Sequence, residues 1–211
     1  MIQLPVLILD LDNTIYPVSS IGNELFEPLF DLLKKEEYGL SPETLEEAKQ
    51  DVQRIPFQKV ADKYNFPEEL NEKALNLLRN LTYNGEIEAF DGFDAMRKYN
   101  CTRFLVTSGF TKLQQSKITK LKLENDFTGI YIIDPEVTDK TKKDVFEEII
   151  RKYQINGEDV IVIGDDPESE IKAATDLSLR SILIDSEGQY SGSVASQNVK
   201  SLREALKDLK C

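Results

Sequence analysis

Apolar positions along the 211-residue chain follow two patterns, which separate expected strands from expected helices. Short continuous apolar runs are typical of strands buried on both faces of a parallel sheet, and they predict strands at residues 6–9, 103–107, 129–133, 159–163 and 180–184. Apolar residues spaced three and four positions apart predict helices at 111–121, 142–153, 167–177 and 201–209. The alternation predicts an α/β fold in which right-handed βαβ units build a parallel, Rossmann-like sheet. The Ser- and Gly-rich stretch 185–198 is expected to be a surface loop.

The segment between the first two expected strands, roughly residues 16–88, has helical spacing and no convincing strand. Pro28 is expected to kink or restart its first helix. Ser41-Pro42-Glu43 reads as an N-cap, a first-turn proline and a first-turn acid, and so begins another helix. We therefore expect an α/β core of residues 1–15 and 89–211, with a helical insert of residues 16–88 that forms a cap.

Charge and composition limit the partners that the protein could bind. A net charge of −12 and a pI near 4.6 argue against nucleic acid or an anionic membrane as a partner. An acidic protein that handles phosphates must build a local positive site from a metal ion or a few lysines. The absence of histidine excludes Ser-His-Asp and Cys-His catalysis and histidine-based zinc sites.

Two cysteines, Cys101 and Cys211, provide no disulfide framework, which fits a reducing cytosol. The first apolar run is short and lacks a preceding basic region, so no signal peptide is expected. Nothing approaches the roughly 20 apolar residues that span a bilayer. We expect a cytoplasmic protein, monomeric or weakly homodimeric, that acts on a small molecule.

Asp10 and Asp12 follow the first expected strand, at the sheet edge where ligands of parallel sheets collect. Two close anions repel each other, so the pair needs a cation, a shared proton or strong hydrogen bonds. A simple turn, in which Asn13 and Thr14 bond the backbone, would also account for polar residues here. The functional interpretation is that Asp10 attacks a phosphorus atom and Asp12 handles protons.

Hydroxyl groups follow the next strand of the core, at Thr107-Ser108-Gly109. Hydroxyls and backbone amides here could bind phosphate oxygens, and Gly109 would permit close approach. An ordinary Ser/Thr turn before a helix is the simpler explanation when this motif is taken alone.

Three lysines, Lys140, Lys142 and Lys143, lie at the start of the helix expected at 142–153. Lysines are disfavoured at a helix N-terminus because the macrodipole is positive there. The cluster therefore indicates a nearby anion, although a solvated run of lysines accounts for the composition equally well.

Acidic residues follow the strand at 159–163, in the segment Gly164–Glu170. With Pro167 as the first helical residue, Asp166 is an ordinary N-cap. That account leaves Asp165 unexplained at the end of the strand, where a hard oxygen ligand would suit Mg²⁺.

These four polar sets should converge, because each follows a strand or begins a helix at the same edge of a parallel sheet. Carboxylates for a metal ion, a lysine, and hydroxyl or amide donors together compose a phosphoryl-transfer site. A dianionic phosphate can approach a carboxylate nucleophile only when positive groups neutralise the charge.

On these residues the chain resembles the haloacid dehalogenase (HAD) superfamily of phosphohydrolases. Asp10-Leu11-Asp12-Asn13-Thr14 resembles the first motif of that family, Thr107 the second, Lys140 the third, and Gly164–Glu170 the acidic fourth. The expected insert lies where the family places its C1 caps. The opening, extended through Ile15-Tyr16-Pro17, is more distantly similar to pyrimidine 5'-nucleotidase-like members.

The resemblance implies catalytic and metal-binding roles. Asp10 would attack phosphate and become an aspartyl-phosphate, while Asp12 would protonate the leaving oxygen and then activate water. Asp10, the backbone carbonyl of Asp12, and Asp165 would hold Mg²⁺. Glu170 and Asp166 would support them, and since the family commonly has aspartate at the position of Glu170, its link to metal or lysine could run through water.

The resemblance also implies a phosphate-binding set of Thr107, Ser108 and Lys140. Lys142 could replace Lys140 if the preceding loop is longer than assumed. Asp12 favours phosphoester hydrolysis over dehalogenation, because a halide leaving group needs no general acid.

The function expected from these residues is Mg²⁺-dependent hydrolysis of a small phosphomonoester, with a nucleoside monophosphate as one candidate. A phosphosugar mutase-type phosphotransferase and a catalytically retired binding protein on the same fold are the alternatives. Specificity should come from the insert, where some aromatic residues would face the leaving group or simply pack in the helical core: Tyr16, Phe26, Phe30, Phe57 and Tyr64.

Overall fold

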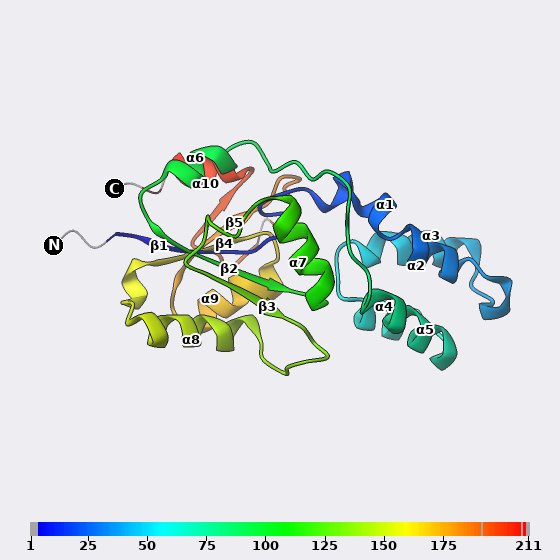
Figure 1. Ribbon diagram of the computed structural model, residues 1–211. Helices are drawn as coiled ribbons and strands as arrows, with labels where there is room; N and C mark the ends of the chain where they lie inside the picture. The colour runs from blue at the N-terminus through cyan, green and yellow to red at the C-terminus, as the bar shows by residue number, and fades with distance from the viewer. Residues whose placement is uncertain (1–3, 191, 208, 210–211) are drawn as a thin grey trace.

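The computed structural model describes residues 4–190, 192–207 and 209 of the chain. Six parallel strands form one sheet in the order β3-β2-β1-β4-β5-β6 (Figure 1). The strands are β1 (Val6–Leu9), β2 (Thr102–Ser108), β3 (Gly129–Ile133), β4 (Val160–Gly164), β5 (Arg180–Ile184) and β6 (Gln197–Val199). The expected α/β class with a parallel sheet is confirmed.

β1 lies inside the sheet and is buried on both faces, as its continuous apolar run predicted. Side chains alternate along a strand, so Leu7 and Leu9 enter one apolar cluster, while Val6 and Ile8 enter the other. The register pairs Leu9 with Leu105 of β2 and with Ile163 of β4. Because of this register, the residues that follow β1 and β4 emerge side by side.

Helices cover both faces of the sheet. Residues of α8 (Lys142–Tyr153) and α9 (Lys172–Asp176) pack in the cluster that contains Val6. Residues of α6 (Phe93–Lys98), α7 (Thr111–Lys120) and α10 (Leu202–Lys207) pack in the cluster that contains Leu7.

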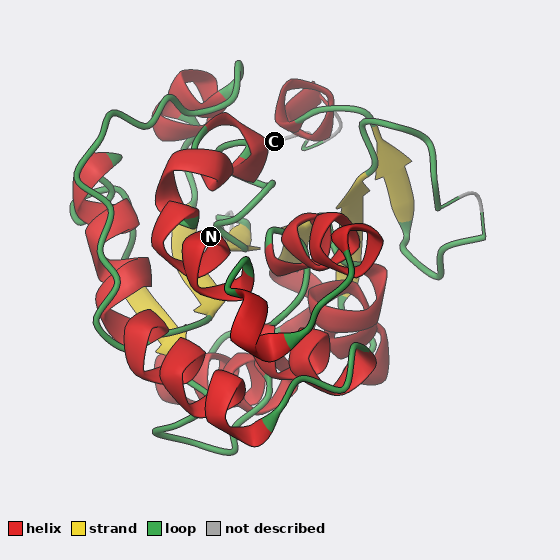
Figure 2. Ribbon diagram, turned by 90° about the vertical axis from the view of Figure 1, so that its right-hand side faces the viewer, coloured by secondary structure: helices red, strands yellow, loops and turns green. Residues whose placement is uncertain are grey.

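A group of helices lies between β1 and β2 in the sequence and beside the sheet in space. Figure 2 shows these helices facing the viewer, with the strands behind them. They are α1 (Gly22–Leu25), α2 (Glu27–Leu33), α3 (Pro42–Val52), α4 (Phe57–Lys63) and α5 (Glu68–Leu78). The expected interruption near Pro28 occurs at Phe26, between α1 and α2, and Ser41 caps α3 by accepting a hydrogen bond from Thr44 N at 3.1 Å.

Three details differ from the sequence-based prediction. The prediction of a surface loop at 185–198 was wrong for its last two residues. β6 begins at Gln197, which pairs with Ile182 of β5. This strand has only three residues and a single buried one, so its hydrophobic pattern was too short to detect. The helix expected at 167–177 begins with a π-helical turn, Pro167–Ile171, and α6 was not predicted at all.

Two further points concern Cys211 and the length of the helices. Cys211 lies outside the described residues. Within the described part of the chain, no helix is both long enough and apolar enough to cross a membrane.

Asp134, directly after β3, fixes the start of α7. Its Oδ2 accepts hydrogen bonds from the backbone amide and the hydroxyl of Thr111, both at 2.8 Å, and its Oδ1 accepts one from Glu136 N at 3.1 Å. Burial raises the pKa of Asp134, but the hydrogen bonds from Thr111 outweigh burial and leave the pKa below its ordinary value.

We expect Asp134→Ala to lower the free energy of unfolding by about 2 kcal/mol at pH 7, because it removes the cap of α7. Since the folded-state pKa is depressed, this stabilisation is present above the unfolded pKa and is lost as pH falls through the folded value. Urea unfolding of wild type and variant at pH 7 and pH 3 should show a difference that shrinks in acid. Asp139→Ala, at an exposed position of the following loop, serves as the control; equal losses in the two variants would contradict the capping role.

Candidate active site

The carboxyl ends of β1, β2 and β4 gather the expected site residues around one cavity of about 820 Å³. The backbone amide of Asp10 donates to Ile163 O at 3.0 Å, which joins the ends of β1 and β4. The cavity is lined by the residues expected from the sequence to be catalytic, metal-binding, phosphate-binding or supporting: Asp10, Asp12, Thr107, Ser108, Lys140, Asp165, Asp166 and Glu170, together with Lys142. The helices between β1 and β2 provide the facing wall, through residues such as Phe26, Phe57 and Leu78.

Lys142 is the cation at the centre of this site. Its Nζ lies 2.6 Å from Asp10 Oδ1 and 2.6 Å from Glu170 Oε2, and all three side chains are buried. The contact with Glu170 is direct, which corrects the expectation that this link could run through water. Burial alone would lower the pKa of Lys142, but the two carboxylates outweigh it and raise that pKa.

Lys140, the lysine first assigned to this position, also lines the cavity but forms its ion pair away from these acids. Its side chain is about half exposed and pairs with Glu148 Oε2 at 2.6 Å on the surface of α8. The reason is the helix start: Thr141 is the N-cap of α8 in a capping box with Asp144, so Lys142 is the first helical residue and turns inward. The geometry therefore favours the alternative, Lys142, which contacts the acids, over Lys140 as the lysine of this site.

Glu170 is held by the strand end that precedes it. Its Oε1 accepts a hydrogen bond from Asp166 N at 2.7 Å, and a Cβ added to Gly164 would lie only 2.1 Å from that oxygen. Glycine is required at position 164 because the carboxylate passes so close to the backbone. Asp166 also accepts a hydrogen bond from Glu168 N at 2.8 Å, so it acts as the expected N-cap.

Asp10 and Asp165 are carboxylates in excess of the available positive charge. Burial, partly opposed by Lys142, raises the pKa of Asp10 to about 7. Burial and the charges of Asp10 and Glu170 raise the pKa of Asp165 to about 8. One buried lysine therefore serves three neighbouring acids, and this edge of the sheet is suited to a further cation.

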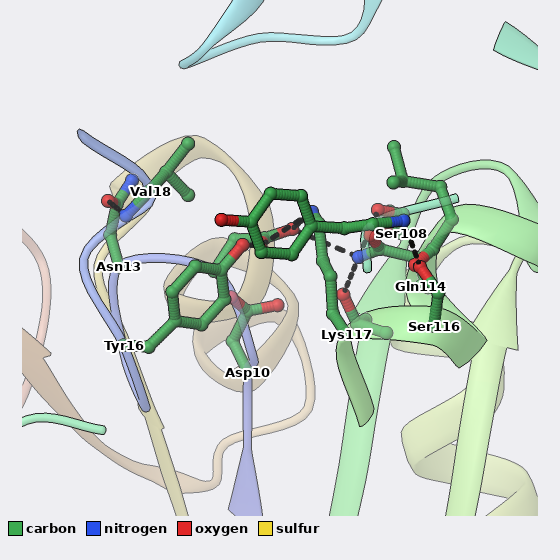
Figure 3. Close-up of polar contacts among 12 residues, drawn as sticks. Asp10, Asn13, Tyr16, Val18, Ser108, Gln114, Ser116 and Lys117 are labelled. Atoms are coloured by element: carbon green, nitrogen blue, oxygen red, sulfur yellow. Dashed lines mark hydrogen bonds and ion pairs between the residues drawn. The ribbon is translucent and has the colours of Figure 1, made fainter. Parts of the chain in front are cut away.

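Asp12 lies in a different environment, in contact with Tyr16, Gln114 and Lys117, which are labelled in Figure 3. The Tyr16 hydroxyl donates to its Oδ1, Gln114 Nε2 donates to its Oδ2 at 2.9 Å, and Lys117 Nζ contacts both oxygens at 2.9 and 3.1 Å. Burial raises the pKa of Asp12, but Lys117 and these hydrogen bonds outweigh burial and lower it. The two aspartates are thus shifted in opposite directions although only one residue separates them.

A tight turn after Asp12 places its carboxylate in a different environment from that of Asp10. Asn13 has a left-handed backbone (φ 54°), which asparagine tolerates better than most residues. Its side chain accepts a hydrogen bond from Val18 N at 3.0 Å, and Ile15 N donates to Leu11 O at 2.9 Å. The turn brings Tyr16 back beside Asp12, so the turn interpretation and the functional interpretation of this motif both apply.

The hydroxyl of Thr107 is buried and accepts a hydrogen bond from Gln114 Nε2 at 2.6 Å. Ser108 is exposed to the cavity, and its backbone carbonyl accepts from the same amide at 3.2 Å. Gly109 has a positive φ of 143°, which favours glycine where the chain leaves β2. Gln114 therefore links this motif to Asp12.

Three residues around Asp12 were not assigned this role from the sequence: Tyr16, Gln114 and Lys117. Tyr16 was expected among residues of the insert that face the leaving group, but it is fully buried and bonds Asp12 instead. Gln114 and Lys117 lie on the buried face of α7, beside Leu113 and Ile118. Polar residues at these apolar positions of a helix were the signal that could have identified them.

The aromatic residues of the insert divide into two groups. Phe26 and Phe57 line the cavity, as expected for residues that face a leaving group. Phe30 is buried and packs against Phe26, and the Tyr64 hydroxyl donates to Asp51 Oδ2 at 2.8 Å. Neither Phe30 nor Tyr64 is among the residues that line this cavity.

The sequence matches the model of the haloacid dehalogenase-like hydrolase family over residues 7–184. The chain belongs to this family. No curated protein matches its sequence.

Solved structures extend the likeness of this HAD-family chain to its whole length. It superposes on the haloacid dehalogenase-like protein SP0104 of Streptococcus pneumoniae with a TM-score of 0.74 at 16% identity, covering 100% of both chains. A HAD phosphatase of Thermococcus onnurineus gives a TM-score of 0.62 at 17% identity over 97% of both chains. YfnB of Bacillus subtilis, solved with bound magnesium, gives 0.69 at 18% identity over 97% of this chain and 98% of its own. At these identities the likeness establishes the fold.

The donor set of this HAD-family chain fits a magnesium ion. Asp10 and Asp165 offer hard carboxylate oxygens on neighbouring strand ends, and their raised pKa values mark a place where a cation would replace protons. In the described part of the chain, no three acidic, histidine or cysteine side chains are grouped to hold a metal by themselves. A magnesium ion here would thus rely on these two carboxylates, a backbone carbonyl such as that of Asp12, and water.

We expect Lys142→Met to lower the free energy of unfolding by about 3 to 5 kcal/mol, because it leaves buried carboxylates without their cation. Lys140→Met is the matched control, and since its ion pair is exposed the change should stay within about 0.5 kcal/mol. Urea unfolding at pH 7 measures both. Similar losses in the two variants would contradict the geometry found at the start of α8.

Proposed function

We propose that this HAD-family protein is a Mg²⁺-dependent phosphomonoester hydrolase that acts through an aspartyl-phosphate on Asp10. The observation that carries the proposal is the contrast between two neighbouring carboxylates on one cavity. Asp10 is buried against Lys142 at the end of β1, while Asp12 is surrounded by donors on the adjoining turn. The two carboxylates therefore face one cavity from separate surroundings, Asp10 beside Lys142 and Asp12 beside α7, so each can serve a separate role in the same reaction.

In the first step an Asp10 carboxylate oxygen attacks the phosphorus of the substrate. The bond from phosphorus to the ester oxygen breaks, and that oxygen takes a proton from Asp12 and leaves as an alcohol. Lys142 holds Asp10 in place, and Thr107 and Ser108 offer a hydroxyl group or backbone amide to the transferring phosphoryl group.

In the second step a water molecule attacks the phosphorus of the aspartyl-phosphate and gives a proton to Asp12. The bond between phosphorus and Asp10 breaks, which releases inorganic phosphate and restores both aspartates to their initial protonation. Bound Mg²⁺ would neutralise the phosphate oxygens, held by Asp10, Asp165 and the backbone carbonyl of Asp12.

The substrate class we propose is a small phosphorylated metabolite. The helical insert between β1 and β2 has the position of a C1 cap, and its Phe26, Phe57 and Leu78 contribute an apolar wall to the cavity. The comparisons give no support to a closer relation with nucleotidases. We therefore treat a nucleoside monophosphate as one candidate substrate among several phosphorylated metabolites. The partner is accordingly a small molecule, with the protein acting as a monomer or weak homodimer.

Hydrolysis of phosphoesters is preferred over dehalogenation for this chain, although similar folds include a dehalogenase with a TM-score of 0.61 at 11% identity. A halide ion leaves without a proton, so the first step of dehalogenation has no use for a general acid. Asp12, held beside Asp10 on the same cavity, offers a group that could protonate the ester oxygen of a phosphomonoester.

A panel of phosphorylated metabolites with Mg²⁺, including nucleoside monophosphates and sugar phosphates, tests the proposed activity by release of inorganic phosphate. On the best substrate, Asp10→Asn should lower kcat by at least about 10³-fold with an unchanged circular dichroism spectrum, because the nucleophile is lost. Beryllium fluoride with Mg²⁺ should form an acyl-phosphate mimic on Asp10 of the wild type only. Near-normal turnover by the variant would refute the nucleophile assignment.

Removal of divalent metal with EDTA should abolish turnover, and added Mg²⁺ should restore it. Binding is measured separately from activity: Mg²⁺ should raise the Tm of the wild type but much less that of Asp165→Asn, since a ligand is lost. Asp62→Asn, at an exposed position that does not line the cavity, is the control. Full activity in EDTA, or the same Tm increase in all three proteins, would exclude the proposed metal site.

A further inference from the structure

Lys117 is a buried ammonium group on a helix whose other lysines are exposed. It is 3% exposed and lies on the face of α7 that packs Leu113 and Ile118 into the core, whereas Lys112 and Lys120 face solvent. Burying an unpaired ammonium costs several kcal/mol, so an apolar residue would serve a purely structural helix better. The compensation is Asp12, whose two oxygens Lys117 contacts.

The donors around Asp12 come from two separate parts of the chain. Lys117 and Gln114 project from α7, and the Tyr16 hydroxyl approaches from the turn after β1 (Figure 3). Each carboxylate oxygen receives two donors, which is close to the capacity of the group. With both oxygens held from two sides, the carboxylate cannot rotate freely.

The same network extends to the neighbouring motif. Gln114 Nε2 lies 2.9 Å from Asp12 Oδ2 and 2.6 Å from Thr107 Oγ1, so one amide sets the relative position of both groups. Lys117 Nζ also lies 5.9 Å from the ring centroid of Tyr16, which keeps the three donors packed against one another.

We infer that Lys117, with Tyr16 and Gln114, is a positioning residue that fixes the Asp12 carboxylate for proton transfer to the leaving oxygen and from the attacking water. The inference rests on the proposed function. An aspartate in a short turn has freedom at both side-chain torsions, and proton transfer needs the carboxylate within hydrogen-bond reach of the reacting oxygen. The network supplies that orientation through the hydrogen bonds and the ion pair that its three side chains make with Asp12.

The test uses Lys117→Met, which keeps the length of the side chain and removes its charge and donors. Tyr16→Phe removes a single hydroxyl, and Lys120→Met makes the same change as the first variant at an exposed position of the same helix. Each protein is assayed with Mg²⁺ on an alkyl phosphate and on p-nitrophenyl phosphate, whose leaving group departs as a stable anion. The ratio kcat/KM covers the steps up to departure of the leaving group, so it isolates protonation of the ester oxygen.

We expect Lys117→Met to lower kcat/KM for the alkyl phosphate by about 10²-fold and for p-nitrophenyl phosphate by less than about threefold. Tyr16→Phe should show the same selectivity with a smaller loss, and Lys120→Met should match the wild type. In pre-steady-state assays, the first two variants should release a burst of p-nitrophenol approaching one equivalent per active site. The burst is expected because water attack on the aspartyl-phosphate becomes slower than its formation. Lys117→Arg, which restores a cation, should recover part of the activity on the alkyl phosphate.

Other results would overturn the inference. Equal losses on both esters without a burst would show that Lys117 acts through stability alone, and unchanged activity on both would show that the network is dispensable. If Lys117→Met does not fold, Tyr16→Phe decides by the same selectivity. If the wild type hydrolyses neither these esters nor any member of the metabolite panel, the proposed function fails and the inference with it.

Discussion

The ion pairs of Lys142 with Asp10 and Glu170 are the interaction on which the rest of the site depends. The parallel register of β1 and β4 brings acids to one edge of the sheet, where burial would otherwise keep them protonated. A lysine at the first position of a helix is itself unfavourable, because the helix dipole is positive there. The buried acids compensate for a lysine at the positive end of the helix, and the lysine compensates for the burial of the acids. Each is therefore stable only when the other is present.

The different surroundings of Asp10 and Asp12 follow from a single local feature, the turn at Asn13. Asp10 belongs to the end of a buried strand and faces Lys142, whereas Asp12 belongs to the turn and faces α7 and Tyr16. Identical side chains thereby receive opposite shifts in pKa without any difference in their own chemistry. The short spacing between them keeps both groups close enough to act on one phosphoryl group.

The parts of this structure that depend on local pattern could be predicted from the sequence, and the parts that depend on long-range contacts could not. The buried strand at Val6–Leu9 and the helix at Lys142–Tyr153 have strong periodicity and were predicted at the bounds observed. The choice between Lys140 and Lys142 depends on which side chain reaches Asp10 and Glu170, a long-range contact that the bounds of the helix do not reveal. The contact of Lys117 with Asp12 joins positions 105 residues apart, so only the polar interruption in an apolar helix face pointed to it.

The separation of chemistry from specificity has a structural basis in the attachment of the insert. The residues assigned to the reaction come from the sheet edge, its turns, α7 and the start of α8, while the insert contributes Phe26, Phe57 and Leu78 to the cavity. The insert contacts the core through polar groups at its end: Arg79 pairs with Glu136 after β3, and Tyr83 N donates to Ser116 of α7 at 2.9 Å. The side chains of Arg79 and Glu136 are partly exposed, so their ion pair contributes little to stability. The wall residues Phe26, Phe57 and Leu78 are buried in the apolar cluster that also contains Leu7 and Leu9 of β1, so the insert and the sheet share one packed interior beside the cavity.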